Sequence, residues 1–294
     1  MTLILRIKGK INNPNAPKLI KYDPIENSIG SLFLWDAGRQ PFSVTPANGT
    51  VLPNLLDDFD NATGKAFEVT KGTASVNNDY AKIELTQKKA LHFIVSQTYP
   101  TDIPGEAFWG ILGDSALMAH IYDQIVNNPN LYISFWIQGT RKGKDRSGKF
   151  GPMLSYVRDN NSNSVFYMTS KESKPVVSAN STSISKLQNV AGTVDAFLSP
   201  NAHQMNVRGY SFQPVYPDSR FFLGSGIFGP WSTELALNES PSFALYRIYV
   251  EDLKLSGRTF EQVKAIDDAE FEKAFSVGGR FYNDTWSNPV TVLP

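Results

Sequence analysis

The chain contains no cysteine, only three histidines and no net charge. Without cysteine, disulfides, thiolate zinc sites and thiol nucleophiles are all excluded. The histidines stand far apart, at positions 92, 120 and 203, and do not form a zinc-ligand pattern. Lysine plus arginine and aspartate plus glutamate each number 28. This balance creates no overall field that would attract nucleic acid or an anionic membrane, so we expect neither as a partner.

The sequence also lacks long hydrophobic runs. None approaches the roughly 20 apolar residues that a membrane-spanning helix requires, so we expect no membrane insertion. The opening residues, MTLILRIKGK, interrupt their apolar run with Arg6 and Lys8 and alternate in the manner of a strand, unlike a signal peptide. We therefore expect a protein that is made in the cytoplasm without a cleaved leader.

What the sequence does contain is a mixture typical of a β protein. Hydrophobic residues make up 41% and aromatic residues 12%, with 21 glycines and 18 prolines. This composition predicts a packed core and many short strands joined by tight turns. Between about residues 61 and 255, at least nine segments have the pattern of short strands bounded by Gly, Pro, Asn or Asp. They predict an antiparallel β-sandwich, because parallel strands would need long crossovers.

The chain divides into three zones. Residues 1–60 form an N-terminal extension of short strands and proline-containing loops, which we expect to pack on the main body or on a neighbouring subunit. Residues 61–277 form the sandwich and end in a helix over TFEQVKAIDDAEFEKAF, where Thr259 and Gln262 have capping-box spacing. GDSALMAHIYDQIVNN predicts a second helix. Residues 278–294 form an extended C-terminal tail.

The tail carries three large rings, Phe281, Tyr282 and Trp286. Large rings on a terminal segment usually cover an apolar surface. We expect this segment to dock onto its own domain or onto a sister subunit, and to serve as an assembly tail.

The strand NLYISFWIQGT has two different faces. Alternation places Phe135 with the aliphatic residues on one face, and Tyr132, Ser134 and Trp136 on the other. The second face is too aromatic for a plain solvent surface. We predict that both faces are packed, one against the opposing sheet and one under loops or a helix. We expect Trp136 to be buried between the two sheets.

Three segments resemble a known family. LYISFWIQGT resembles the inner-sheet strand of concanavalin-like and laminin-G-like jelly rolls, which often read aliphatic-x-Ser-x-Trp-aliphatic. FFLGSG, from Phe221 to Gly226, is similar to the strand of that family that ends in a Gly-Ser turn. ALYRIYVEDLKLSGRTFEQV, from Ala244 to Val263, is similar to its closing strand and short helix. Their order over roughly residues 65–270 implies an all-β, concanavalin-like antiparallel β-sandwich, a jelly roll.

The N-terminal zone adds a second resemblance. GTVLPNLLDDF, from Gly49 to Phe59, precedes the sandwich. This arrangement is similar to bacteriophage virion proteins of tails and baseplates that carry such a domain. The resemblance implies a virion protein.

Two enzyme patterns can be tested against the sequence. Gly113-Asp114-Ser115 is similar to the nucleophile block of GDSL esterases, but none of the histidines stands in the Asp-x-x-His arrangement that this chemistry requires. Capping of the next helix by Asp114 or Ser115 is the preferred interpretation. Concanavalin-like glucanases use Glu-x-Asp-x-x-Glu, which neither YVEDL nor DDAEFE reproduces. We therefore expect no enzyme, and a glycan hydrolase is the least favoured alternative.

Few residues remain as binding candidates. Asp57, Asp58 and Asp60 offer hard oxygen ligands suited to Ca²⁺, but without EF-hand spacing, so a solvated turn is preferred and we expect no cofactor. The run RKGKDRSGK reads as a basic hairpin tip, either simply solvated or in contact with an acidic glycan or subunit. Exposed rings could stack on a sugar, and His92 is expected at the edge of the core. The contact candidates are Trp231, Tyr210, Tyr216, Arg141, Lys142, Lys144 and Arg146.

Two functional classes fit these observations. The first is a non-enzymatic structural and interaction protein of a bacteriophage virion, placed in the tail, baseplate or fibre. It would assemble with itself as a homo-oligomer and with other virion proteins. The second is a carbohydrate-binding, lectin-like receptor-recognition domain that contacts a cell-surface glycan. We expect the first, because the sequence offers no complete catalytic set and ends in a long aromatic tail.

Overall fold

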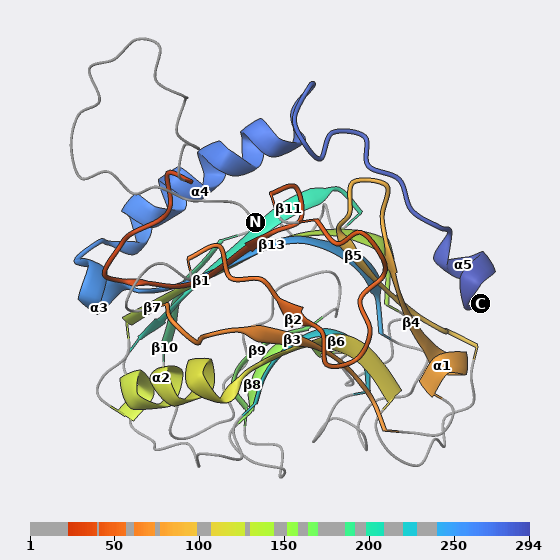
Figure 1. Cartoon of the computed structure of the whole chain (residues 1–294), viewed down its shortest axis with the longest axis horizontal. Helices are drawn as coiled ribbons and strands as arrows, with labels where there is room; N and C mark the ends of the chain where they lie inside the picture. Colours follow the sequence, from red (N-terminus) through yellow and green to blue (C-terminus); the bar gives the residue numbers. More distant parts are fainter. Residues whose placement is uncertain are drawn as a thin grey trace.

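The computed structural model describes residues 23–39, 41–56, 62–73, 77–98, 107–126, 130–143, 152–157, 164–169, 186–191, 198–208, 220–227 and 240–294. These residues form two stacked antiparallel sheets with a small number of helices (Figure 1). The predicted β-rich, antiparallel architecture is confirmed, since every strand pair of the described part is antiparallel.

The first sheet, sheet A, is built around two long strands that pair with each other. Its order is β10 (Lys186–Ala191), β11 (Pro200–Arg208), β7 (Asn130–Arg141), β13 (Ser242–Asp252), β5 (Leu91–Val95) and β4 (Ala81–Leu85). Strand β1 (Ser31–Asp36) pairs with β13 beyond the end of β5. The second sheet, sheet B, has the order β2 (Val51–Leu52), β3 (Phe67–Lys71), β6 (Ala107–Gly113), β12 (Arg220–Ile227), β8 (Pro152–Val157) and β9 (Ser164–Thr169).

The main core lies between the two sheets. Leu131, Ile133 and Phe135 of β7 contribute to it from sheet A, and Phe67 and Phe221 contribute from sheet B. These side chains are at most 1% exposed. The aliphatic face of β7 is therefore packed against the opposing sheet, as its alternation predicts.

The helices confirm two sequence predictions. α2 (Ser115–Val126) and α4 (Phe260–Phe275) lie where their patterns place them. α4 begins with a complete capping box, in which the Gln262 N–H donates to Thr259 Oγ1 over 3.2 Å and the Thr259 N–H donates to Gln262 Oε1 over 2.8 Å. This cap satisfies two backbone donors that the helix itself leaves unpaired. The other three described helices are single turns, α1 (Asn77–Tyr80), α3 (Leu253–Ser256) and α5 (Pro289–Val292).

α4 covers the outer face of sheet A (Figure 1). Trp136 of β7 is fully buried there and meets the rings of Phe271 and Phe275 edge-on, at centroid distances of 5.4 and 6.2 Å. The prediction that Trp136 lies between the two sheets is therefore wrong. Alternation sends this ring to the opposite side from Phe135, and a helix instead of a sheet covers it.

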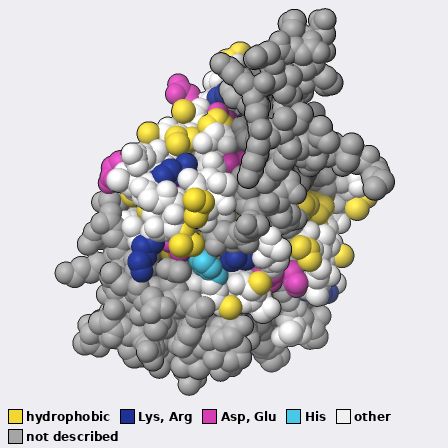
Figure 2. Space-filling model, turned by 60° about the vertical axis from the view of Figure 1, so that its left-hand side comes forward, with side chains coloured by type: hydrophobic (Ala, Val, Ile, Leu, Met, Phe, Trp, Pro, Cys, Tyr) yellow, Lys and Arg dark blue, Asp and Glu magenta, His cyan; other side chains and the backbone are white. Residues whose placement is uncertain are grey.

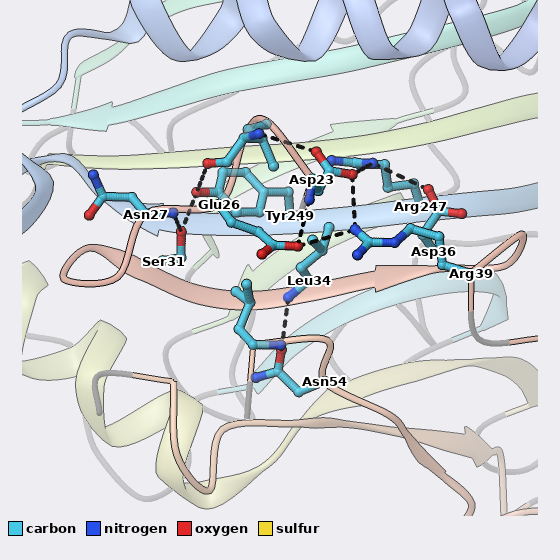
Figure 3. Close-up of polar contacts among 12 residues, drawn as sticks. Asp23, Glu26, Asn27, Ser31, Leu34, Asp36, Arg39, Asn54, Arg247 and Tyr249 are labelled. Carbon is cyan, nitrogen blue, oxygen red and sulfur yellow. Dashed lines mark hydrogen bonds and ion pairs between the residues drawn. The ribbon is translucent and has the colours of Figure 1, made fainter. Parts of the chain in front are cut away.

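The described part of the N-terminal zone supplies β1 to sheet A and β2 to sheet B. The edge of β1 that pairs with no other strand is covered by the side chain of Asn54. The Asn54 side chain accepts the Leu34 N–H over 3.0 Å and donates to the Leu32 carbonyl over 3.1 Å, so it occupies the place of a neighbouring strand (Figure 3). Leu55 continues the contact, because its N–H donates to the Leu34 carbonyl over 2.8 Å. A closed edge prevents pairing with a foreign strand.

The tail runs from the end of α4 along the β4–β5 side of sheet A to α5 (Figure 1). Phe281 is buried on the outer side of sheet A against Tyr246 and Phe275. Further on, the Ser287 N–H donates to Glu84 Oε1 over 3.0 Å. Pro294 ends beside β5, where the N–H of Gln97 donates to its carbonyl over 3.0 Å. The tail therefore docks onto its own chain, one of the two arrangements that its rings predict.

Candidate functional site

The polar face of β7 holds a buried carboxylate from the chain itself. Asp267, in the middle of α4, is fully buried. Its oxygens accept hydrogen bonds from Ser134 Oγ at 2.5 Å, Gln204 Nε2 at 3.0 Å, Tyr132 Oη at 3.1 Å and Trp136 Nε1 at 3.1 Å. Three of these donors, Tyr132, Ser134 and Trp136, stand at alternate positions of β7. Alternate side chains of a strand lie on the same face, so all three reach Asp267. The polar face of β7 therefore binds a part of the same chain, the helix α4.

The charge of Asp267 depends on opposing effects. Burial raises the pKa of Asp267, while the positive charge of Arg247 and the hydrogen bonds from Ser134 and Gln204 act to lower it, and the net direction is upward. A buried carboxylate costs desolvation unless it is paired, and four donors supply that pairing here. The arrangement fixes the position of α4 on sheet A.

Beside Asp267 and its four donors lies a buried ionic network that joins distant segments of the chain (Figure 3). Arg247, in the middle of β13, has no exposed surface. Its Nη1 donates to Asp23 Oδ2 at 2.6 Å and to Asp36 Oδ2 at 3.2 Å, and its guanidinium lies 4.5 Å from the centre of the Trp136 ring. Arg280, at the start of the tail, donates to Asp36 Oδ2 at 2.6 Å. The network ties the N-terminal zone and the tail to the same strand.

The N-terminal carboxylates of this network differ in their titration. Burial alone would raise the pKa of Asp23, but the charge and hydrogen bond of Arg247 outweigh it, and the pKa is lowered. Burial raises the pKa of Glu26, although Arg39 lies 3.2 Å from it. The lowered pKa favours an ionised Asp23 beside the buried arginine.

A second buried cluster lies at the other end of β1. Tyr249 Oη lies 2.6 Å from Ser31 Oγ and donates to Glu251 Oε2 over 2.6 Å. Arg258 forms an ion pair with Glu251 and donates to the Ile25 carbonyl over 2.7 Å. Like the Arg247 network, this cluster binds residues of the chain to each other.

A third polar group on the outer face of sheet A is a hydrogen-bonded series. His92 Nδ1 lies 2.9 Å from Glu84 Oε1, and His92 Nε2 lies 2.8 Å from Thr140 Oγ1. The three residues come from β4, β5 and β7. His92, which we expect at the edge of the core, is fully buried. Its two partners have no spacing signal, because they lie 8 and 48 residues from it in the sequence.

The remaining histidines lie apart from this series. His120 Nε2 lies 3.3 Å from Asp252 Oδ2, and Asp252 also caps α3. His203 is buried against Phe135, with ring centroids 5.4 Å apart, and burial lowers its pKa to about 4. Asp114 caps α2, because its Oδ1 accepts the N–H of Leu117 over 2.8 Å. The preferred, structural interpretation of the Gly-Asp-Ser motif is thus confirmed.

The structure places two of the basic contact candidates. Arg141 is partly buried and donates to the Leu293 carbonyl over 2.8 Å, and burial lowers its pKa to about 10. Lys142 is exposed. Arg141 thus supports the tail, while Lys142 faces solvent at the root of the basic run.

The other candidates lie outside the described residues. These are Trp231, Tyr210, Tyr216, Lys144 and Arg146, together with Asp57, Asp58 and Asp60. Within the described part, no group of three or more acidic or histidine side chains is placed to hold a metal ion. None of the described helices is long and apolar enough to span a membrane.

The rings of the tail differ in exposure. Phe281 is 1% exposed and Tyr282 is 37% exposed. Trp286 is partly buried, with its ring centroid 6.2 Å from that of His92. Tyr282 is therefore the tail ring most available to another molecule.

A pocket of about 260 Å³ opens on the described surface, between the segment from Val51 to Asn54 and the turn from Thr63 to Ala66. Figure 2 shows that hydrophobic and charged side chains are interspersed over the described part of one face. The residues that line this pocket include no carboxylate.

No protein-family model matches the chain, and no curated protein matches it. The function of this chain is therefore inferred from its residues and their arrangement.

Proposed function

We propose that the chain is a non-enzymatic structural and interaction protein of a bacteriophage virion, a component of the tail, baseplate or fibre built on a concanavalin-like jelly roll. The strand pairing supports the fold part of this proposal. The three segments that resemble the family lie in β7, in β12 and in β13 with α3 and α4. β7 and β13 are neighbours in sheet A, and β12 lies within sheet B.

The observation that carries the proposal is the closure of the outer face of sheet A by distant parts of the same chain. Asp23 and Asp36, from the N-terminal zone, pair with Arg247, and Arg280, from the tail, pairs with Asp36. Breaking one partner of such a buried pair typically costs about 3–5 kcal/mol. The N-terminal zone and the tail are thus held on one strand, which gives the chain a defined outer surface for assembly.

We assign partner docking to the side of the tail that stays exposed when the tail packs on sheet A. Tyr282 and Val290, on the tail, are 37% and 56% exposed. We assign contact with virion proteins, and with further copies of the chain, to this side of the molecule.

Co-expression tests this function. The full chain should form a defined complex when it is produced together with the proteins encoded by the neighbouring genes. Tyr282→Ala combined with Val290→Ala should weaken that complex while leaving the fold intact, since both side chains face solvent. Val277→Ala is the matched control, because Val277 is 82% exposed but precedes the tail. A complex that is equally stable in all variants would contradict the assignment of this surface.

A lectin-like function is the second candidate, and the position of Lys142 favours it. Lys142 is exposed at the end of β7, where the basic run begins. An acidic glycan would be attracted to such a group. Binding to a glycan array that weakens in Lys142→Ala and in Trp231→Ala would support this function, whereas a folded protein that binds no glycan would refute it.

A further inference from the structure

Three neighbouring parts of sheet A bring a carboxylate, an imidazole and a hydroxyl into one hydrogen-bonded series. Glu84 lies directly opposite His92 in the β4–β5 pair, and His92 lies opposite Ala244 of β13. The small Ala244 side chain leaves room for the imidazole to reach Thr140, on the next strand. The distances are 2.9 Å from Glu84 Oε1 to His92 Nδ1 and 2.8 Å from His92 Nε2 to Thr140 Oγ1.

The direction of these hydrogen bonds follows from the chemistry of the groups. The pKa of Glu84 is lowered: burial raises it, but hydrogen bonds from His92 and Ser287 outweigh this effect. An ionised carboxylate can only accept, so His92 Nδ1 carries the proton in this pair. In a neutral imidazole Nε2 is then the acceptor, and the Thr140 hydroxyl donates to it. The Nε2 lone pair is thus aimed at a hydroxyl proton.

We propose that Thr140 is a nucleophilic hydroxyl, with His92 as its general base and Glu84 as the positioning carboxylate, and that it accepts an acyl group from a small carboxylic ester. This is the connectivity by which an imidazole activates a hydroxyl for acyl transfer. The inference goes beyond the proposed virion function: assembly itself requires no reaction, and this site would add an ester-cleaving activity to a role that is otherwise non-enzymatic.

The reaction balances without a further reactant except water. Thr140 Oγ1 forms a bond to the ester carbonyl carbon while His92 Nε2 takes the hydroxyl proton. When the carbon–oxygen bond to the alcohol breaks, Nε2 returns the proton to the leaving oxygen. Water, deprotonated by the same nitrogen, then releases the carboxylic acid and restores the hydroxyl. Glu84 stabilises the imidazolium that forms in each half of the reaction.

The surroundings limit the ester to a small one. Thr140 is partly buried, and His92 is fully buried beneath the tail. Trp286 places its ring centroid 6.2 Å from that of His92, and the Ser287 N–H donates to the same Glu84 oxygen that binds the imidazole. The tail therefore walls the site and holds its carboxylate, and an acetyl group is the simplest acyl group to test.

The test uses the full chain and p-nitrophenyl acetate. Peptide mass spectrometry of the quenched reaction should find one acetyl group on Thr140. Thr140→Val, which has nearly the same shape without the hydroxyl, should lose this acetylation, and Thr140→Ser should retain it. Glu84→Gln should lower the acetylation rate about 100-fold, because His92, the general base, loses the carboxylate that orients it. It should also move the acid limb of the pH–rate profile to lower pH, because the imidazolium loses its countercharge.

The outcomes separate reactivity from a merely structural role. Acetylation confined to lysines or tyrosines of the folded wild-type chain would overturn the proposal. So would acetylation of Thr140 at an unchanged rate in Glu84→Gln, since the carboxylate would then not act through the imidazole. A thermal melt of each variant confirms that its fold is intact, and the wild-type result decides the question even if a variant unfolds.

Discussion

The strongest structural prediction concerns Asp267, because removal of its carboxylate leaves four buried donors without their acceptor. In Asp267→Ala, hydrogen bonds from Tyr132, Ser134, Trp136 and Gln204 are lost together. Each buried donor left unpaired costs about 1–3 kcal/mol. Some of these donors find other partners, and the carboxylate no longer has to be desolvated. We therefore expect a net loss of about 3–5 kcal/mol in the free energy of unfolding.

The assay is urea denaturation at neutral pH, followed by near-ultraviolet circular dichroism, which reports on Trp136. Glu272→Gln is the control on the same helix, since Glu272 is exposed. Its effect should stay within about 0.5 kcal/mol. If Asp267→Ala lost about 1 kcal/mol or less, the carboxylate would not be the element that fixes α4 to the sheet, and the reasoning would be refuted.

Three further predictions concern titration and capping. The stability difference between wild type and Asp23→Asn should be complete above the ordinary aspartate pKa of 3.8 and disappear as the pH falls below it, because the folded-state pKa of Asp23 is lowered; pH-dependent urea denaturation measures this difference. His203 should remain neutral in the fold, so stability should fall by about 3 kcal/mol between pH 6.5 and about 4, where only the unfolded chain takes up the proton. The same series of measurements on His203→Phe should show this part of the acid loss removed, and an unchanged acid profile would count against a neutral buried imidazole. Thr259→Ala should lower the unfolding free energy by about 1 kcal/mol through loss of the α4 cap, and a melting temperature equal to wild type would contradict that role.

Local patterns predicted much of the architecture. Alternation along NLYISFWIQGT indicated two packed faces, and the spacing of Thr259 and Gln262 located the start of α4. The antiparallel pairing followed from short strands without long connections. In each case the signal lies within a few neighbouring residues, where the backbone period fixes which side chains share a face.

The polar contacts could not be predicted because they join residues far apart in the sequence. Asp267 lies 131 residues from Trp136, and Arg247 lies 224 residues from Asp23. DDAEFE read only as an acidic cluster on a helix, and Arg247 only as one residue of a strand. Their pairing depends on which face of sheet A receives α4, and that is decided by the packing of the whole molecule.

For the tail, too, the sequence predicts a contact but not its detail. The rings of the tail predict docking, but they do not predict that Phe281 is buried and Trp286 only partly buried. Because Phe281 is buried, removal of residues 281–294 would test folding together with assembly. A truncation after Asn283 retains Phe281 and is the sharper test of an assembly role, in which loss of partner binding at an intact fold is the expected result.

The central claim is that this closed sandwich is a building block of a larger particle. Sedimentation velocity of the purified full chain, alone and mixed with the proteins encoded by the neighbouring genes, tests that claim most directly. We predict a defined homo-oligomer or a stoichiometric complex with one of those proteins. A chain that sediments as an unassociated monomer in every mixture would contradict the claim.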